Sequence, residues 1–171
     1  NAPYKNLLGV RKLSSYNETL TAYDGLKNAY IMHKDLFKIT DRTLTYEEII
    51  CRLEKLKTTL DLSFNALNTT YELLINSTTS INFTQTTLDS LKDKILAQKE
   101  KVTASLSSIA STKKSVEGYQ LQKTSSITSY QNTIDSTEQA LKTAEKNFDS
   151  AKATADVQLT SAKNVLSQDQ D

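Results

Sequence analysis

Scarcity of glycine and proline is the feature that most restricts what this chain can fold into. The 171 residues contain 3 glycines and 1 proline, whereas average usage predicts roughly 12 and roughly 8. Tight turns between strands depend on these two residue types. Most sheet folds are therefore excluded. Hydrophobic residues make up only 37% of the chain, which favours a thin, elongated helical assembly over a thick globular core.

The spacing of the apolar residues is helical from Leu13 onward. Leucine, isoleucine and tyrosine recur at intervals of three, four and seven residues, as they do on one face of an α-helix. The pattern predicts helices over about 13–37, 46–76 and 85–168. Residues 1–12 are a leader, loose or partly helical, and 13–171 form a single elongated helical domain.

Two threonines mark helix starts. Thr45 precedes two glutamates, a typical cap sequence, and either Thr84 or Thr86 caps the last helix. The segments 38–45 and 77–84 between the helices are expected to be connections. Because these connections are short, neighbouring helices are expected to run antiparallel.

A strict seven-residue apolar repeat runs through the last helix. Its first part holds Leu88, Ile95, Val102, Ile109 and Val116. Its second part, in a different phase, holds Ile127, Ile134, Leu141 and Phe148 and continues through Ala155 and Ala162. Such repeats are typical of coiled coils, so the nine large residues are our candidate helix-packing or interface positions.

The phase change near Gly118 leaves two arrangements open. The interval from Val116 to Ile127 is a stutter of seven plus four residues, which a continuous helix tolerates. The alternative is a turn at Gly118. We therefore predict an all-α fold: an antiparallel bundle of three helices, or four if the chain turns, with a long coiled-coil helix.

The residue inventory argues against an enzyme. One histidine, His33, and one cysteine, Cys51, cannot build a His/Cys metal site. The three glycines lie far apart, so no phosphate-binding loop is present. We expect no catalytic residues, no cofactor and no metal.

Individual residues have plain structural interpretations. His33 is expected to be solvated at a helix end, and Cys51 to be a small buried hydrophobe. Tyr16, Tyr23 and Tyr30 repeat every seven residues and are expected to form a seam with a wet edge. Gly25 within the first helix would allow a neighbouring helix to approach closely.

Charge and hydropathy give no support for nucleic acid as a partner or for a membrane-spanning segment. The formal net charge of +1 gives no argument for nucleic acid, and no apolar run approaches the about 18 residues that a bilayer span requires. The opening Asn1-Ala2 is typical of a cleaved expression tag, so we expect a domain cut from a longer protein.

Residues 84–109 and 136–166, the latter including Glu138-Gln-Ala-Leu-Lys-Thr-Ala-Glu-Lys, resemble a known family. They are similar to the α-helical hairpin region of membrane fusion proteins, the haemolysin-D-like periplasmic adaptors. The earlier helices resemble the helical bundle inserted in some members.

The resemblance implies a non-enzymatic structural domain of an efflux or type I secretion transporter. Its partners would be transporter subunits and copies of itself, and it would lie outside the cytoplasm. Its parent would be anchored in the inner or cytoplasmic membrane, so membrane association would come only through other parts of the parent.

Two alternatives remain at this stage. One is an extracytoplasmic four-helix-bundle sensor domain, which requires the turn at Gly118 and a ligand pocket between the first two helices, near the tyrosines. The other is a coiled-coil surface or adhesin spacer, which the many serines and threonines would suit.

Overall fold

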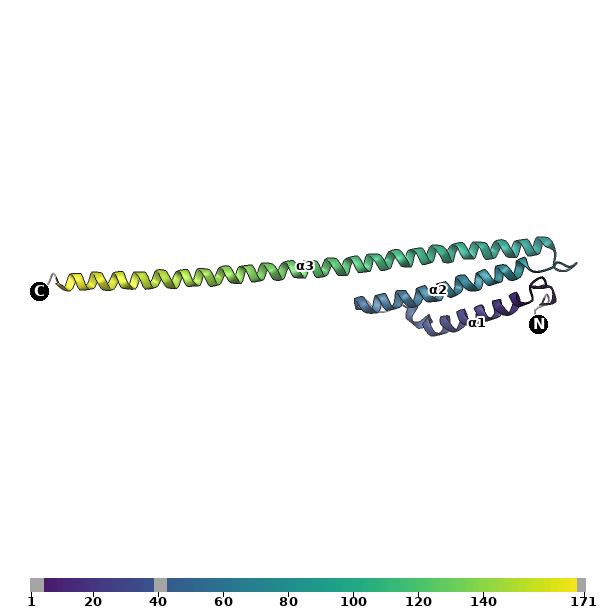
Figure 1. Cartoon of the computed structure of the whole chain (residues 1–171), viewed down its shortest axis with the longest axis horizontal. Helices are drawn as coiled ribbons and strands as arrows, with labels where there is room; N and C mark the ends of the chain where they lie inside the picture. The colour runs from purple at the N-terminus through teal and green to yellow at the C-terminus, as the bar shows by residue number, and fades with distance from the viewer. Residues whose placement is uncertain (1–4, 39–42, 169–171) are drawn as a thin grey trace. The chain divides into compact units, whose positions relative to one another are not determined.

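The computed structural model describes residues 5–38 and 43–168, and in them the protein is all-α (Figure 1). No strand occurs in these residues, which confirms the all-α part of the predicted fold. The elements, in chain order, are η1 (Lys5–Leu7), α1 (Ser14–His33), η2 (Lys34–Phe37), α2 (Tyr46–Ile75) and α3 (Gln85–Gln168), where η denotes a 3-10 helix.

The α-helices lie close to where the apolar spacing placed them. Helix α2 ends one residue before the expected boundary, and α3 has the expected bounds. Helix α1 ends at His33, where a 3-10 helix continues to Phe37. Residues 39–42, half of the connection predicted over 38–45, lie outside the described residues, as does Asn1-Ala2.

Both predicted threonine caps are present. The Thr45 side chain accepts a hydrogen bond from the backbone N–H of Glu48 at 3.2 Å, and the Glu48 carboxylate accepts one from the Thr45 N–H at 2.7 Å. This reciprocal pair is a capping box. At the start of α3, the Thr84 hydroxyl accepts from the Thr87 N–H at 3.3 Å, so Thr84 rather than Thr86 is the cap.

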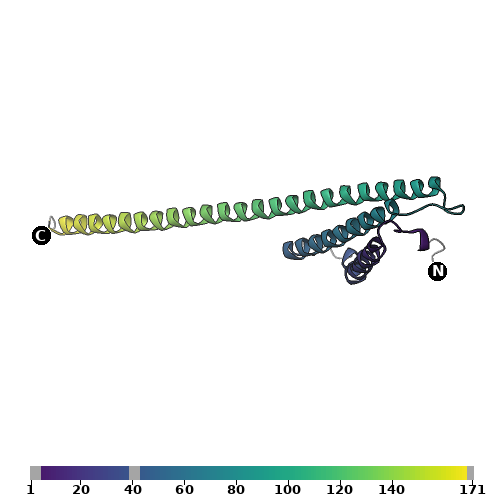
Figure 2. The same ribbon diagram turned by 45° about the vertical axis from the view of Figure 1, so that its right-hand side comes forward.

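The chain divides into two compact units, Asn1–Tyr119 and Gln120–Asp171. The first contains α1, α2 and the first part of α3, and α2 lies between the other two helices in both Figure 1 and Figure 2. The second unit is the remainder of α3. Helix α3 is unbroken at Gly118, so the expected continuous helix is confirmed and no turn occurs there.

Small side chains, not tyrosines, form the seam between α1 and α2. The buried residues of α1 are Ser15, Ala22 and Ala29, each one position before a tyrosine of the predicted seam. Small residues let two helix backbones approach closely, and the adjoining bulky rings are then left at the edge. Tyr23 and Tyr30 are accordingly 55% exposed, so the prediction that they form the core of this seam was wrong.

The best-buried apolar cluster lies where α2, α3 and the N-terminal segment meet. Phe83, in the α2–α3 connection, is 1% exposed, and it packs with Leu74 of α2 and Leu88 of α3. Leu7 and Leu8 pack against the same cluster. Leu7 and Leu8 of the expected leader therefore contribute to the core of the first unit.

Backbone hydrogen bonds fix this N-terminal segment to the α2–α3 connection. The Arg11 N–H donates to the Asn76 carbonyl at 2.9 Å, and the Thr78 N–H donates to the Leu7 carbonyl at 2.9 Å. Between them, the Gly9 N–H donates to the Ser77 hydroxyl at 3.1 Å. Gly9 has a φ of 65°, a conformation that favours glycine.

The other two glycines are helical and have open space around them. A Cβ atom built on Gly25 or Gly118 would meet no atom within 4 Å. The expectation that Gly25 permits a close helix approach is therefore wrong, because alanines at neighbouring turns provide that approach.

Gly118→Ala is expected to stabilise α3. Alanine is favoured over glycine in a helix interior by about 1 kcal/mol, and no neighbouring atom opposes the added methyl group. Circular dichroism during thermal unfolding would measure the gain. A loss of helix content in this variant would contradict a continuous helix at this point.

Candidate helix-packing interface

The first part of the apolar repeat packs inside the first unit. Leu88 is 4% exposed and Ile109 is 7% exposed, while Ile95, Val102 and Val116 are half-buried. These five residues lie on one face of α3. Leu88 and Ile95 join the cluster that contains Leu74 of α2, so this end of the repeat is used within the chain.

The second part of the repeat is exposed. Every residue from 121 to 167 is exposed, and the four large candidates there range from 51% exposure at Ile134 to 69% at Phe148, with Ile127 and Leu141 between them. We call the two heptad rows of this section the α3 stripe. The stripe consists of Ile127, Tyr130, Ile134, Thr137, Leu141, Ala144, Phe148, Ala151, Ala155, Gln158, Ala162 and Val165.

The exposure of the apolar side chains along the α3 stripe requires an explanation. Single exposed apolar residues are ordinary, but a continuous apolar surface on a protein marks an interaction site. Helices in water draw most of their stability from packing an apolar face. The α3 stripe is therefore the strongest candidate interface in the described chain.

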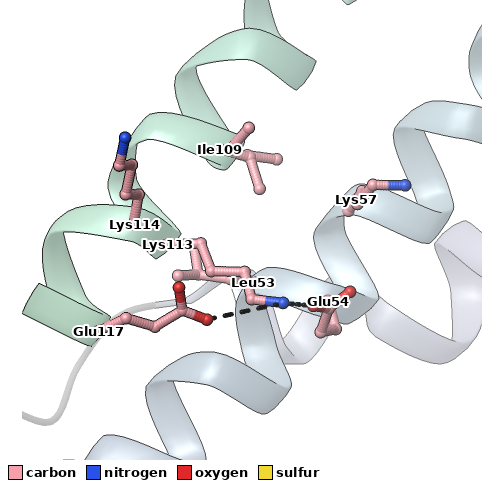
Figure 3. Close-up of a pocket in the computed structure, with 8 residues that line it drawn as sticks. Leu53, Glu54, Lys57, Ile109, Lys113, Lys114 and Glu117 are labelled. Carbon is pink, nitrogen blue, oxygen red and sulfur yellow. Dashed lines mark hydrogen bonds and ion pairs between the residues drawn. The ribbon is translucent and has the colours of Figure 1, made fainter.

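A charged cluster joins α2 to α3 within the first unit (Figure 3). The Lys113 ammonium of α3 donates to the Glu54 carboxylate of α2 and lies 3.9 Å from the Glu117 carboxylate. These groups line a shallow cavity of about 470 Å³, whose apolar wall includes Leu53 and Ile109. Both members of the Glu54–Lys113 pair are partly exposed, so its contribution to stability is small and reduced by salt.

The interaction with Lys113 lowers the pKa of Glu54, first through the hydrogen bond and then through the positive charge. Because the pKa is lower in the folded state, the ionised Glu54 stabilises the fold at pH values above the ordinary pKa of 4.5. This stabilisation is lost as the pH falls through the pKa of the folded state. The pKa of Lys113 is raised for the reciprocal reasons, so its contribution is lost only at strongly alkaline pH.

The free energy of unfolding is expected to fall less between pH 7 and pH 3 in Glu54→Gln than in the wild type, because the variant has no carboxylate to protonate at this position. Urea unfolding at the two pH values, in the wild type and in the variant, measures this difference. Glu100→Gln, at an exposed glutamate of α3, is the control and should follow the wild type. An unchanged pH dependence in Glu54→Gln would contradict the assignment.

A second α2–α3 contact centres on Lys99. Its ammonium lies 5.2 Å from the Phe64 ring centroid and 5.6 Å from that of Tyr71, and it donates to the Asn68 side-chain oxygen at 2.9 Å. A cation over two aromatic faces is attracted by both rings. Lys99 thus joins α3 to the face of α2 that carries Phe64, Asn68 and Tyr71.

A groove of about 460 Å³ runs between α1 and α2. Tyr23 and Tyr30 line it from α1, and Leu56 and Thr59 from α2. Nearby, the His33 Nδ1 lies 2.9 Å from the Thr59 hydroxyl oxygen. His33 is therefore half-buried and hydrogen-bonded across the helices, rather than fully solvated as predicted.

Cys51 is exposed, so the expectation of a buried hydrophobe is wrong. It follows two half-buried isoleucines near the start of α2, and the helical turn carries it away from their face.

Within the described residues no group of three or more His, Cys, Asp or Glu side chains is arranged to hold a metal ion. None of the described helices is both long and apolar enough to cross a bilayer.

Sequence reasoning missed the residues that join the ends of helices. Phe83, Gly9 and Ser77 lie in segments without apolar periodicity, so no pattern pointed to them. The only available signals were a glycine outside the helices and a phenylalanine within a polar connection.

Comparisons with protein-family models, with curated proteins and with solved structures found no match to this chain.

Proposed function

We propose that this chain is a non-enzymatic helical domain of a membrane-fusion-type, periplasmic adaptor subunit of an efflux or type I secretion transporter. The observation that carries the proposal is the α3 stripe, an apolar heptad surface that is exposed from Ile127 to Val165. A surface of this kind suits a role in which helices pack on partner subunits. The domain would lie outside the cytoplasm, with its parent anchored in the inner or cytoplasmic membrane.

The proposed mechanism is mechanical. The first unit is tied together by the Phe83 cluster and by the Lys99 and Lys113 contacts, and would act as an antiparallel three-helix bundle. The second unit would form a coiled coil with a partner through the α3 stripe. No small-molecule chemistry is required of this domain.

Photocrosslinking in the host cell tests this role. A photoreactive phenylalanine analogue at Leu141, in the stripe, is expected to form adducts with transporter subunits or with another copy of the parent protein. The same analogue at Lys146, on the opposite side of the helix, is the control. Identical adducts from both positions, or only cytoplasmic proteins from Leu141, would contradict the proposal.

The sensor alternative has one observation in its favour. The groove between α1 and α2 lies beside Tyr23 and Tyr30, where a ligand pocket was expected. The turn at Gly118 that this alternative requires is not present. Thermal stabilisation of the chain by members of a small-molecule panel, abolished by Tyr30→Ala, would favour the sensor over the adaptor.

A further inference from the structure

The two rows of the α3 stripe differ in the order of their large and small residues. In the first row the large side chains come first, from Ile127 to Phe148, and alanines follow at 155 and 162. In the second row Tyr130 comes first, alanines occupy the centre at 144 and 151, and Val165 comes last. A partner that covers both rows must place small side chains opposite large ones, because helix interfaces are close-packed.

A second copy of the same stripe meets this condition in the antiparallel direction. In antiparallel pairs of heptad helices, the first row of one helix faces the second row of the other. With Ile127 opposite Val165, the layers of one half-interface are Ile127–Val165, Ile134–Gln158, Leu141–Ala151, Phe148–Ala144, Ala155–Thr137 and Ala162–Tyr130. Both aromatic side chains then face an alanine.

A parallel, in-register pair lacks this complementarity. Each stripe residue would face its own copy, so that Phe148 would meet Phe148 and Ala155 would meet Ala155. The Tyr130 and Phe148 layers would be overfilled and the four alanine layers underfilled, and both kinds of layer are destabilising in a packed interface.

The charges beside the stripe favour the same arrangement. Positions flanking the apolar rows set partner choice and orientation in coiled coils. In the antiparallel register, Glu138 lies opposite Lys152 of the second copy, and this pair occurs twice. Within the described chain neither residue forms an ion pair. On the other flank the facing positions, Ala140 with Thr154 and Thr133 with Ser161, are small and permit close approach.

One flanking contact is unfavourable. Glu145 lies next to the midpoint of the overlap and faces Glu145 of the second copy. If the two helices were shifted by one heptad along each other in one direction, Glu145 would instead lie opposite Lys152. That shift would leave only five of the six layers in each half of the interface. Neutralising Glu145 would therefore strengthen the dimer in the proposed register and weaken it in the shifted one.

We propose that a second copy of this chain covers the α3 stripe in the antiparallel direction, with Ile127 of each copy opposite Val165 of the other. The inference shares with the proposed function only the assignment of the stripe as an interface. Dimerisation of the purified chain would support it whether or not the parent serves a transporter.

Sedimentation equilibrium of the full chain tests the pairing. The expected result is a reversible dimer of about twice the 19.1 kDa chain mass. Glu138→Gln removes both Glu138–Lys152 pairs and is expected to weaken dimerisation about threefold, whereas Glu145→Gln removes the one Glu145–Glu145 repulsion and is expected to strengthen it about twofold. These two variants make the same change of charge seven residues apart, so each is the control of the other. A chain that stays monomeric at every concentration, or a Glu145→Gln variant that weakens the dimer, would overturn the proposal.

Disulfide formation tests the direction independently. In a Cys51→Ser background, Asn147→Cys lies at the midpoint and is expected to crosslink with its own copy. Thr133→Cys occupies the same heptad position but faces Ser161, so it should remain uncrosslinked. Equal crosslinking at both positions, or efficient self-crosslinking of Ala155→Cys, would indicate a parallel pair and overturn the proposal.

Discussion

Phe83→Ala is expected to lower the free energy of unfolding of the first unit by about 3–5 kcal/mol, as for other large-to-small changes of buried aromatic residues. Phe83 is 1% exposed and contacts both Leu74 and Leu88. Its removal would leave a cavity where three segments of the chain meet. Urea unfolding followed by circular dichroism measures the loss.

The matched control is two residues away. Ile81 lies in the same connection but is 95% exposed, so Ile81→Ala should change stability by no more than about 0.5 kcal/mol. Equal losses in the two variants would mean that the connection does not hold α2 and α3 together through Phe83.

Gly9→Ala is expected to destabilise the first unit by more than about 2 kcal/mol. A positive φ costs a non-glycine residue about 1–2 kcal/mol, and Gly9 has a φ of 65°. An added Cβ would also lie 2.6 Å from the Ser15 hydroxyl oxygen and 2.8 Å from a Leu73 methyl carbon. Relief of these contacts would displace the segment that hydrogen-bonds to Ser77.

Gly25→Ala is the control for Gly9→Ala, since Gly25 has ordinary helical geometry and no atom near its added Cβ. It should leave stability unchanged or increase it by up to about 1 kcal/mol. The measurement is again urea unfolding. If both substitutions are neutral, the N-terminal segment does not have the close packing described here.

The helices were predictable because their signals are local. Thr45 and Thr84 announce helix starts within a few residues, and the heptad from Leu88 to Val116 has the period of the helix it forms. The continuity of α3 through Gly118 was also predictable, because the neighbouring residues include no further turn former.

The packing faces were harder to predict because they depend on helices distant in sequence. On α1, the tyrosine repeat and the Ser15, Ala22, Ala29 repeat have the same period and lie one residue apart. Hydrophobicity favours the tyrosines, but close approach to α2 selects the small residues. Sequence periodicity alone does not distinguish these two faces.

The candidate interface shows a similar division. Leu88 and Phe148 belong to the same kind of pattern, yet one is 4% exposed and the other 69% exposed. The position of the start of α2, where Glu54 contacts Lys113, decides how far along α3 the repeat is covered within the first unit. That decision is a property of chain topology, and the heptads themselves do not encode it.

The coding sequence on both sides of this chain tests the adaptor proposal most directly. We expect one membrane helix upstream, with short β-rich, lipoyl-like halves before residue 1 and after residue 171. Two flanking membrane helices followed by a cytoplasmic signalling module would contradict it and identify a sensor instead.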